Sequence, residues 1–197
     1  MSISRKGRFG ALLVMSFALL VAAAPVNAAT TKFGAKLAAG IDPSNSPVTC
    51  DHEIDGGNGT YACTWIMLNA FNGGTLTAPK TGQINKVKLI AWTDGSFKLV
   101  FAKKSGSKFK VVTVGPKVTY HDGCPGDCTV QTYNITPTTV HQGEVVGFQN
   151  FKGGAVRCDS GSSNIALFYP TLPAGGAYTT PTDYSGCKML IQVVYAS

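Results

Sequence analysis

The chain has 197 residues, a formal net charge of +7 and 23 glycines. This length suits one domain with a hydrophobic core of its own, which excludes a scaffold that depends on disulfides alone. Beyond the N-terminal leader, no apolar run approaches the roughly 20 residues of a transmembrane helix, so we expect no stable membrane anchor.

The N-terminus has the residue order of a secretory signal peptide. Three basic residues precede an apolar run over residues 11–24, and small residues follow up to Ala28. We therefore predict a signal peptide over residues 1–28 and a secreted protein, extracellular or periplasmic. All six cysteines lie after this leader, and an even cysteine count in an exported chain predicts disulfide bonds.

The spacing of the cysteines suggests a pairing by proximity along the chain. The predicted disulfides are Cys50–Cys63, Cys124–Cys128 and Cys158–Cys187. Other connectivities stay open, because spacing alone does not determine which cysteines pair. A zinc site at His121, Cys124 and Cys128 and a redox-active Cys124–Cys128 pair are alternatives. We prefer disulfides because exported thiols are usually oxidised.

The mature chain begins with an irregular stretch. Residues 29–49 are predicted as an extended N-terminal segment broken by prolines, and residues 50–197 as one β-sandwich domain. The run Tyr61–Phe71 is apolar at both odd and even positions, which is typical of a strand buried on both faces.

Alternating strands follow in the lysine-rich middle of the chain, where residues 80–117 hold nine lysines and one acid. In Ile84–Trp92, Ser96–Ala102 and Lys108–Val114, apolar residues alternate with lysines, so each strand has one apolar and one basic face. We predict that these three segments form one sheet, with a turn at 103–107. Its outer face would carry Lys86, Lys88, Lys98, Lys108 and Lys110.

The rest of the chain also favours strands over helices, because short apolar runs alternate with glycine- and proline-rich turns. Further strands are predicted at Lys117–Tyr120, Thr129–Asn134, Val145–Gln149, Ile165–Phe168 and Lys188–Tyr195. The predicted fold class is all-β: a disulfide-reinforced, two-sheet antiparallel sandwich of about 8–10 strands.

Two segments resemble turns of secreted bacterial jelly-roll sandwiches. The first is Thr77-Ala78-Pro79-Lys80-Thr81-Gly82-Gln83-Ile84, which leads into an alternating strand, and the second is His141-Gln142-Gly143-Glu144-Val145-Val146-Gly147-Phe148. The resemblance covers about residues 60–195 and implies a jelly-roll-like sandwich of the kind used in carbohydrate-binding and cell-surface domains. It places no catalytic residue on this chain.

An acidic loop is a candidate metal site. Asp51, Glu53, Asp55 and Asn58 have the alternation and glycine content of the first half of a calcium loop. The twelfth position is Ala62 rather than glutamate, so a solvated loop without metal is the alternative. Calcium is therefore a possible cofactor, and no other cofactor is predicted.

Aromatic and basic residues are the candidate ligand contacts. Tyr169, Tyr178 and Tyr184 lie in a loop rich in proline, glycine and threonine, where binding residues usually occur. The five lysines of the predicted sheet would attract an acidic polysaccharide or an anionic surface, unless they form only a solvated face. We expect no nucleic-acid partner.

The sequence predicts an exported, non-catalytic sandwich that binds a surface ligand, most simply a polysaccharide. No nucleophile motif appears, and no pair of acids stands out for hydrolysis, so we predict that the protein is not an enzyme. The alternative is a self-assembling extracellular protein, a matrix, pilus-like or coat component, whose N-terminal segment pairs with a neighbour's sheet to form a homo-oligomer.

Overall fold

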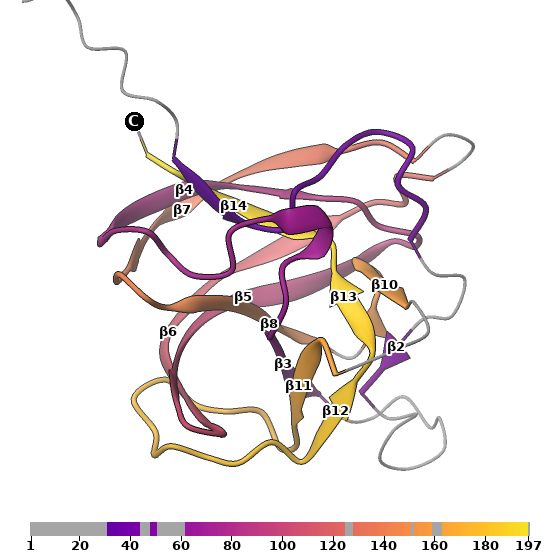
Figure 1. The fold of residues 1–197 in the computed structure, drawn as a ribbon. Helices are drawn as coiled ribbons and strands as arrows, with labels where there is room; N and C mark the ends of the chain where they lie inside the picture. Colours follow the sequence, from indigo (N-terminus) through magenta and orange to yellow (C-terminus); the bar gives the residue numbers. More distant parts are fainter. Residues whose placement is uncertain are drawn as a thin grey trace, which may run out of the picture.

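The fold is all-β, as predicted, and two antiparallel sheets form most of it (Figure 1). The computed structural model describes residues 31–43, 48–50, 62–124, 128–150, 152–158 and 163–196. Within these ranges the one helix is a short 3₁₀ turn, η1 (Phe71–Gly73), and no helix long and apolar enough to cross a membrane occurs.

The first large sheet has four strands and includes both ends of the described chain. Its order is β1 (Lys32–Gly34), β14 (Ile191–Tyr195), β4 (Gly82–Leu89) and β7 (Gln131–Val140). Part of the predicted N-terminal segment is therefore the edge strand β1, paired with β14 in the same chain. At the other edge, β7 contains Pro137, which an edge strand tolerates because one side of it needs no ladder partner.

The second large sheet has six strands. Its order is β12 (Asp183–Ser185), β11 (Ile165–Phe168), β3 (Cys63–Met67), β8 (Val145–Asn150), β5 (Gly95–Ser105) and β6 (Lys108–Tyr120). Two short pairs complete the described part: β10 (Val156–Cys158) with β13 (Cys187–Met189), and β2 (Val48–Thr49) with β9 (Lys152–Gly153).

The strand count exceeds the prediction because six of the strands have only two or three residues. Such short ladders leave no alternation in the sequence. The two predicted strands at Lys108–Val114 and Lys117–Tyr120 form one continuous strand, β6. The turn predicted between β5 and β6 is confirmed: Gly106 has φ +59°, a conformation that glycine adopts without a steric penalty.

The main core lies between the two large sheets. Strand β3 is buried at all five positions, as the mixed apolar pattern predicted. Its Trp65 stacks on Phe148 of β8, with ring centroids 6.0 Å apart. From the opposite sheet, Phe33 of β1 approaches Phe101 of β5 to 6.3 Å between centroids. The N-terminal strand therefore contributes directly to the core.

One prediction about the sheets is wrong. Strand β4 does not join β5 and β6 in one sheet; it pairs with β14 and β7 in the four-stranded sheet. Between the two strands the chain crosses from one layer to the other, and the Trp92 amide donates to the Gly154 carbonyl at 2.9 Å on the way. Period-two alternation identifies the buried face of a strand but not its neighbours.

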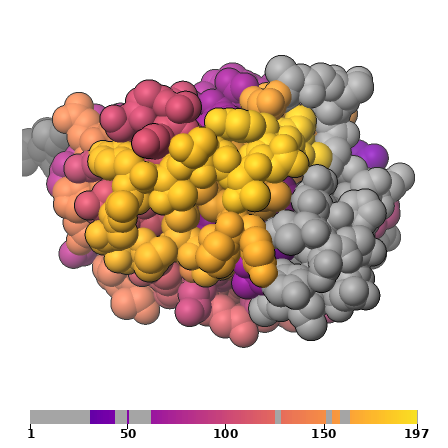
Figure 2. All heavy atoms as spheres, turned by 90° about the horizontal axis from the view of Figure 1, so that it is seen from below, coloured from indigo at the N-terminus to yellow at the C-terminus, as the bar shows by residue number. Residues whose placement is uncertain are grey.

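The six-stranded sheet is strongly curled and buries a second core on its other face. This core gathers apolar side chains from both ends of the sheet, including Val111 of β6 and Ala166 of β11. The segment 169–182 covers it, entering beside β11 and reaching β6, where Thr179 and Phe109 exchange two backbone hydrogen bonds of 2.8 and 2.9 Å. Figure 2 shows the yellow C-terminal part of the chain spread across this face.

The two jelly-roll-like turns lie side by side. The Ala78 amide donates to the Glu144 carbonyl at 2.7 Å, and the Gly143 amide donates to the Ala78 carbonyl at 2.9 Å. The Gln142 amide donates to the Thr81 hydroxyl at 3.0 Å. The segments quoted for the resemblance thus form one corner of the sandwich.

Candidate ligand-binding pocket

A pocket of about 330 Å³ lies on the six-stranded sheet beside the covering segment. This volume is at the lower end of the range for small-ligand sites. The described lining residues come from the position before β3, from β5, β6 and β8, and from the covering segment: Ala62, Ser96, Phe97, Lys98, Lys117, Gln149, Asn150 and Thr171.

The register of the sheet brings the polar part of this lining together. Gln149 of β8 pairs with Thr64 on one side and with Lys98 of β5 on the other, and Lys98 pairs in turn with Lys117 of β6. A cross-strand row therefore leads from a buried hydroxyl to two lysines. Both lysines are exposed.

Hydrogen bonds fix one wall of the pocket. Next to the lining residue Thr171, the Leu172 amide donates to the buried Thr64 hydroxyl at 2.9 Å. Gln149 Nε2 donates to the Leu172 carbonyl at 2.7 Å and to the same hydroxyl at 3.2 Å. The covering segment is thereby held to β3 and β8 where it borders the pocket, so the wall is in place before any ligand arrives.

Asn150 is the unusual member of the lining. It is 95 % buried, since only 5 % of its surface is exposed, yet neither its Oδ1 nor its Nδ2 has a hydrogen-bond partner among the described residues. A buried amide without partners is costly, and such a group in a native protein needs an explanation.

The predicted tyrosines all belong to the covering segment or to β12. Tyr178 and Tyr184 are 43 % and 42 % exposed and are the large apolar side chains most open to solvent in the described part. Tyr169 is half-buried, and its backbone exchanges hydrogen bonds with the Thr182 side chain. None of the three lines the pocket, although Thr171 lies two residues beyond Tyr169.

The predicted lysines do not share one face. Lys86 and Lys88 are on β4 of the four-stranded sheet, whereas Lys98, Lys108 and Lys110 are on β5 and β6 of the six-stranded sheet. Only Lys98 lines the pocket. The sequence analysis did not identify three other lining residues, Lys117, Gln149 and Asn150. The register of the strands brings these residues together, and no local sequence pattern marks them.

Two of the three predicted disulfides are confirmed. Cys50 is bonded to Cys63, and Cys124 to Cys128. Cys187 is also disulfide-bonded, and the register of β10 and β13 places Cys158 directly opposite it. This register is the arrangement that the predicted Cys158–Cys187 bridge requires.

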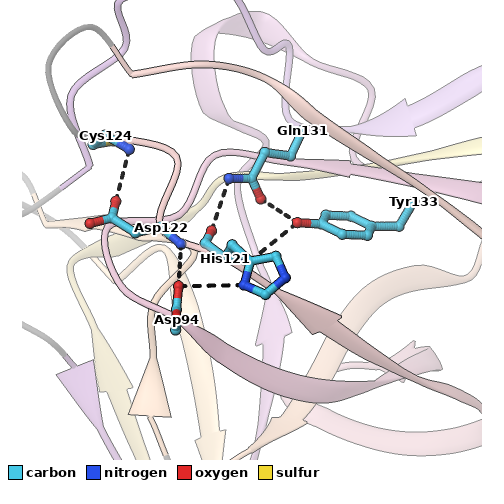
Figure 3. Close-up of polar contacts among 6 residues, drawn as sticks. All are labelled: Asp94, His121, Asp122, Cys124, Gln131 and Tyr133. Carbon is cyan, nitrogen blue, oxygen red and sulfur yellow. Dashed lines mark hydrogen bonds and ion pairs between the residues drawn. The ribbon is translucent and has the colours of Figure 1, made fainter.

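A polar network lies beside Cys124, whose amide donates to the Asp122 carboxylate at 2.8 Å (Figure 3). The Asp94 carboxylate accepts a 2.6 Å hydrogen bond from the Asp122 amide and lies 3.7 Å from His121 Nδ1. A zinc site here would need thiolates, but the two sulfurs are bonded to each other. Because the His121 and Asp94 side chains are about three-quarters exposed, the network forms an open surface rather than a cleft.

The predicted calcium ligands Asp51, Glu53, Asp55 and Asn58 lie outside the described residues. Within the described ranges, no group of three or more His, Cys, Asp or Glu side chains could hold a metal ion. The calcium loop stays a prediction.

Comparison with known proteins adds no relative. The chain matches no protein-family model, no curated protein and no solved structure.

Proposed function

We propose that this protein is an exported, non-catalytic β-sandwich that binds a polysaccharide. The observation that carries the proposal is the pocket on the six-stranded sheet, which is lined by two exposed lysines and by Gln149 and is bordered by the covering segment with its exposed Tyr178. Amides and cations hydrogen bond sugar hydroxyls and acidic groups, and exposed aromatic rings provide flat apolar surface for sugar rings.

The chemistry of the pocket supports binding rather than hydrolysis. Glycosidases use a pair of carboxyl groups on either side of the scissile bond. Among the residues that the structure describes, the eight that line the pocket carry no carboxylate. The buried Glu144, the least exposed acid described, is occupied by hydrogen bonds to His141.

Export is supported by the leader-like order of residues 1–28 and by the disulfides, which persist in oxidising compartments. The proposal therefore places the protein outside the cytoplasm, where polysaccharides are available as ligands.

A binding screen tests the proposal. The purified mature protein is applied to a panel of neutral and acidic polysaccharides by affinity electrophoresis at low and at moderate ionic strength. We expect retardation by at least one polysaccharide, and weaker retardation of a Tyr178→Ala/Tyr184→Ala variant with an unchanged melting temperature. Uniform mobility across the panel at both salt concentrations would contradict the proposal.

Assembly by strand exchange is the second candidate function, and the position of β1 favours it. This three-residue edge strand contributes Phe33 to the core, next to Phe101 and Tyr195. The same contacts would form with a neighbour's sheet if the segment were exchanged.

A cross-link distinguishes the two candidates. In the β1–β14 ladder, the Tyr195 amide donates to the Thr31 carbonyl, and the Ala35 amide donates to the Ile191 carbonyl. Because hydrogen-bonded and non-hydrogen-bonded pairs alternate along an antiparallel ladder, Lys32 and Val194 form a non-hydrogen-bonded pair, in which the two Cα atoms lie close together. In a Lys32→Cys/Val194→Cys variant, a monomer on a non-reducing gel supports the binding module. A disulfide-linked ladder supports assembly.

A further inference from the structure

The edges of the two large sheets are the strands β1, β7, β6 and β12, and three of them are closed or short. A turn closes the outer edge of β1: the Gly34 amide donates to the Thr75 carbonyl at 2.7 Å. The Lys36 amide donates in the same way to the Phe71 carbonyl at 2.9 Å. The covering segment closes the start of β6 through Thr179, and β12 has only three residues.

Strand β7 is open along one side. It has ten residues, and among the described residues β4 is the one segment that forms a backbone ladder with it. It carries no charged residue, whereas β1, β6 and β12 each carry at least one. Charges and prolines on edge strands prevent pairing between sheets. In β7 such protection is limited to Pro137, so residues 131–135 form an unguarded edge.

The backbone groups on this edge can be assigned from the ladders. The Ile90 amide donates to Leu190 at 3.2 Å, so this is a hydrogen-bonded pair of the β4–β14 register. Because such pairs alternate, Lys88 also directs its amide and carbonyl towards β14. Thr132, which is opposite Lys88, therefore directs its own amide and carbonyl away from β4. The same alternation applies to Asn134, two residues further along β7.

The apolar side of this edge is also incompletely covered. Tyr133 and Ile135 pack against the main core but are only partly buried. A strand added beside β7 would cover both side chains and would accept and donate hydrogen bonds at Thr132 and Asn134. The edge thus offers what strand addition uses, namely free main-chain groups and alternate apolar side chains.

We propose that β7 pairs antiparallel with β7 of a second copy of this chain, about a two-fold axis at Tyr133. Thr132 of each copy then pairs with Asn134 of the other, and each such pair exchanges two backbone hydrogen bonds. An uncharged strand meets its own copy without like-charge repulsion. Because a two-fold contact is closed and the β1 edge is covered, assembly stops at the dimer.

Sedimentation equilibrium of the purified mature protein without ligand tests this interface. We expect a monomer–dimer equilibrium. Thr132→Pro removes the outward amide but no bond to β4, so the dissociation constant should rise at least about tenfold. Thr132→Val keeps the amide and is the matched control, with a change of less than about threefold. Monomers at every concentration, oligomers beyond the dimer, or equal effects of the two variants would overturn the proposal.

A charge variant keeps the test valid if Thr132→Pro does not fold. Thr132→Lys/Asn134→Lys places like charges opposite each other across the axis, at two exposed positions, and should produce a monomer. Thr139→Lys/Gln142→Lys adds the same charge at exposed positions outside the paired residues and should leave the dimer intact. Equal dissociation in both variants would overturn the proposal.

A further variant separates this dimer from strand exchange. Oxidised Lys32→Cys/Val194→Cys holds β1 on its own chain, so a dimer formed through β7 should persist, whereas an exchanged dimer should be lost. Loss of the dimer in this variant would overturn the β7 assignment. The inference does not rest on polysaccharide binding: a β7 dimer that binds no polysaccharide would contradict only the proposed function.

Discussion

Phe109 and Phe168 meet edge to face, with ring centroids 5.7 Å apart, although three strands separate β6 from β11 in the sheet. A flat sheet would hold strands at these positions roughly 19 Å apart, at about 4.8 Å per strand. The contact therefore measures the curl of the six-stranded sheet. This curl creates the second core and gives the covering segment a surface on which to pack.

A double-mutant cycle tests this contact. We expect Phe109→Leu and Phe168→Leu each to destabilise the protein by about 1–2 kcal/mol. Their coupling energy should be about 0.5–1.5 kcal/mol, as for other buried aromatic pairs. Urea unfolding of the four proteins gives the value. Additive effects of the two substitutions would contradict a curled sheet.

The Thr64 hydroxyl holds the covering segment, because it accepts hydrogen bonds from the Leu172 amide and from Gln149. Thr64→Val keeps the shape but leaves the Leu172 amide without an acceptor, whereas Gln149 Nε2 keeps its bond to the Leu172 carbonyl. We therefore expect a loss of about 1–3 kcal/mol and faster hydrogen exchange at Leu172. Thr64→Ser keeps the acceptor and should leave the Leu172 amide protected. Equal exchange in the two variants would contradict this role of the hydroxyl.

The sequence allowed the faces of the strands to be predicted better than their neighbours. Alternation identified the buried positions Val87 and Leu89 and the turn between β5 and β6, since both depend on residues close in the chain. It placed β4 in the wrong sheet, because the pairing of β4 with β14 joins residues about a hundred positions apart and leaves no local pattern.

The site was less predictable than the fold. Lys98 was expected to contact ligand because of its alternation, but Lys117, Gln149 and Asn150 carry no motif. Lys98 faces Lys117 because two bulges shift the β5–β6 register, one between Phe101 and Ala102 and one between Lys98 and Val100. Gln149 comes beside Lys98 through the separate β5–β8 pairing. Bulges of this kind re-aim side chains and are not readable from composition.

The buried phenol of Tyr120 predicts a stability change at alkaline pH. Burial raises the pKa of Tyr120 above 10.0, and a backbone hydrogen bond with Gly154 opposes part of the rise. Above about pH 10 the unfolded chain loses this proton first, so stability falls as pH rises towards the folded-state pKa. The contribution of Tyr120 is fully present below that range.

Replacing the phenol tests the assignment. In Tyr120→Phe the free energy of unfolding should fall less steeply between pH 9 and 11 than in the wild type. The two slopes should differ by at most about 1.4 kcal/mol per pH unit. Urea midpoints at each pH provide the measurement. Tyr178→Phe, which changes an exposed ring, is the control and should keep the wild-type slope. Identical slopes for Tyr120→Phe and the wild type would show that another group is responsible.

The pairing of β10 with β13 predicts the third disulfide. Because Cys158 and Cys187 are opposite in register, peptide mapping without reduction should recover their two peptides linked. Removing both sulfurs in Cys158→Ser/Cys187→Ser should cost about 2–4 kcal/mol. The Cys124→Ser/Cys128→Ser variant should lose less, since its loop spans a separation of only four residues. A Cys158 peptide linked elsewhere would contradict the assignment.

The turn before β8 depends on a buried carboxylate. Glu144 is fully buried, and its two oxygens lie 2.9 Å from the amide and from the ring Nδ1 of His141. In Glu144→Gln one of these contacts must face an NH₂ group, so we expect a loss of about 1–3 kcal/mol in urea unfolding.

His141→Ala removes the ring but leaves the amide bonded, so it should cost less than Glu144→Gln. Gln142→Ala changes an exposed side chain of the same turn and should stay within about 0.5 kcal/mol of the wild type. A Glu144→Gln protein as stable as Gln142→Ala would mean that the carboxylate does not hold this corner, and that the backbone bonds between Ala78, Gly143 and Glu144 suffice.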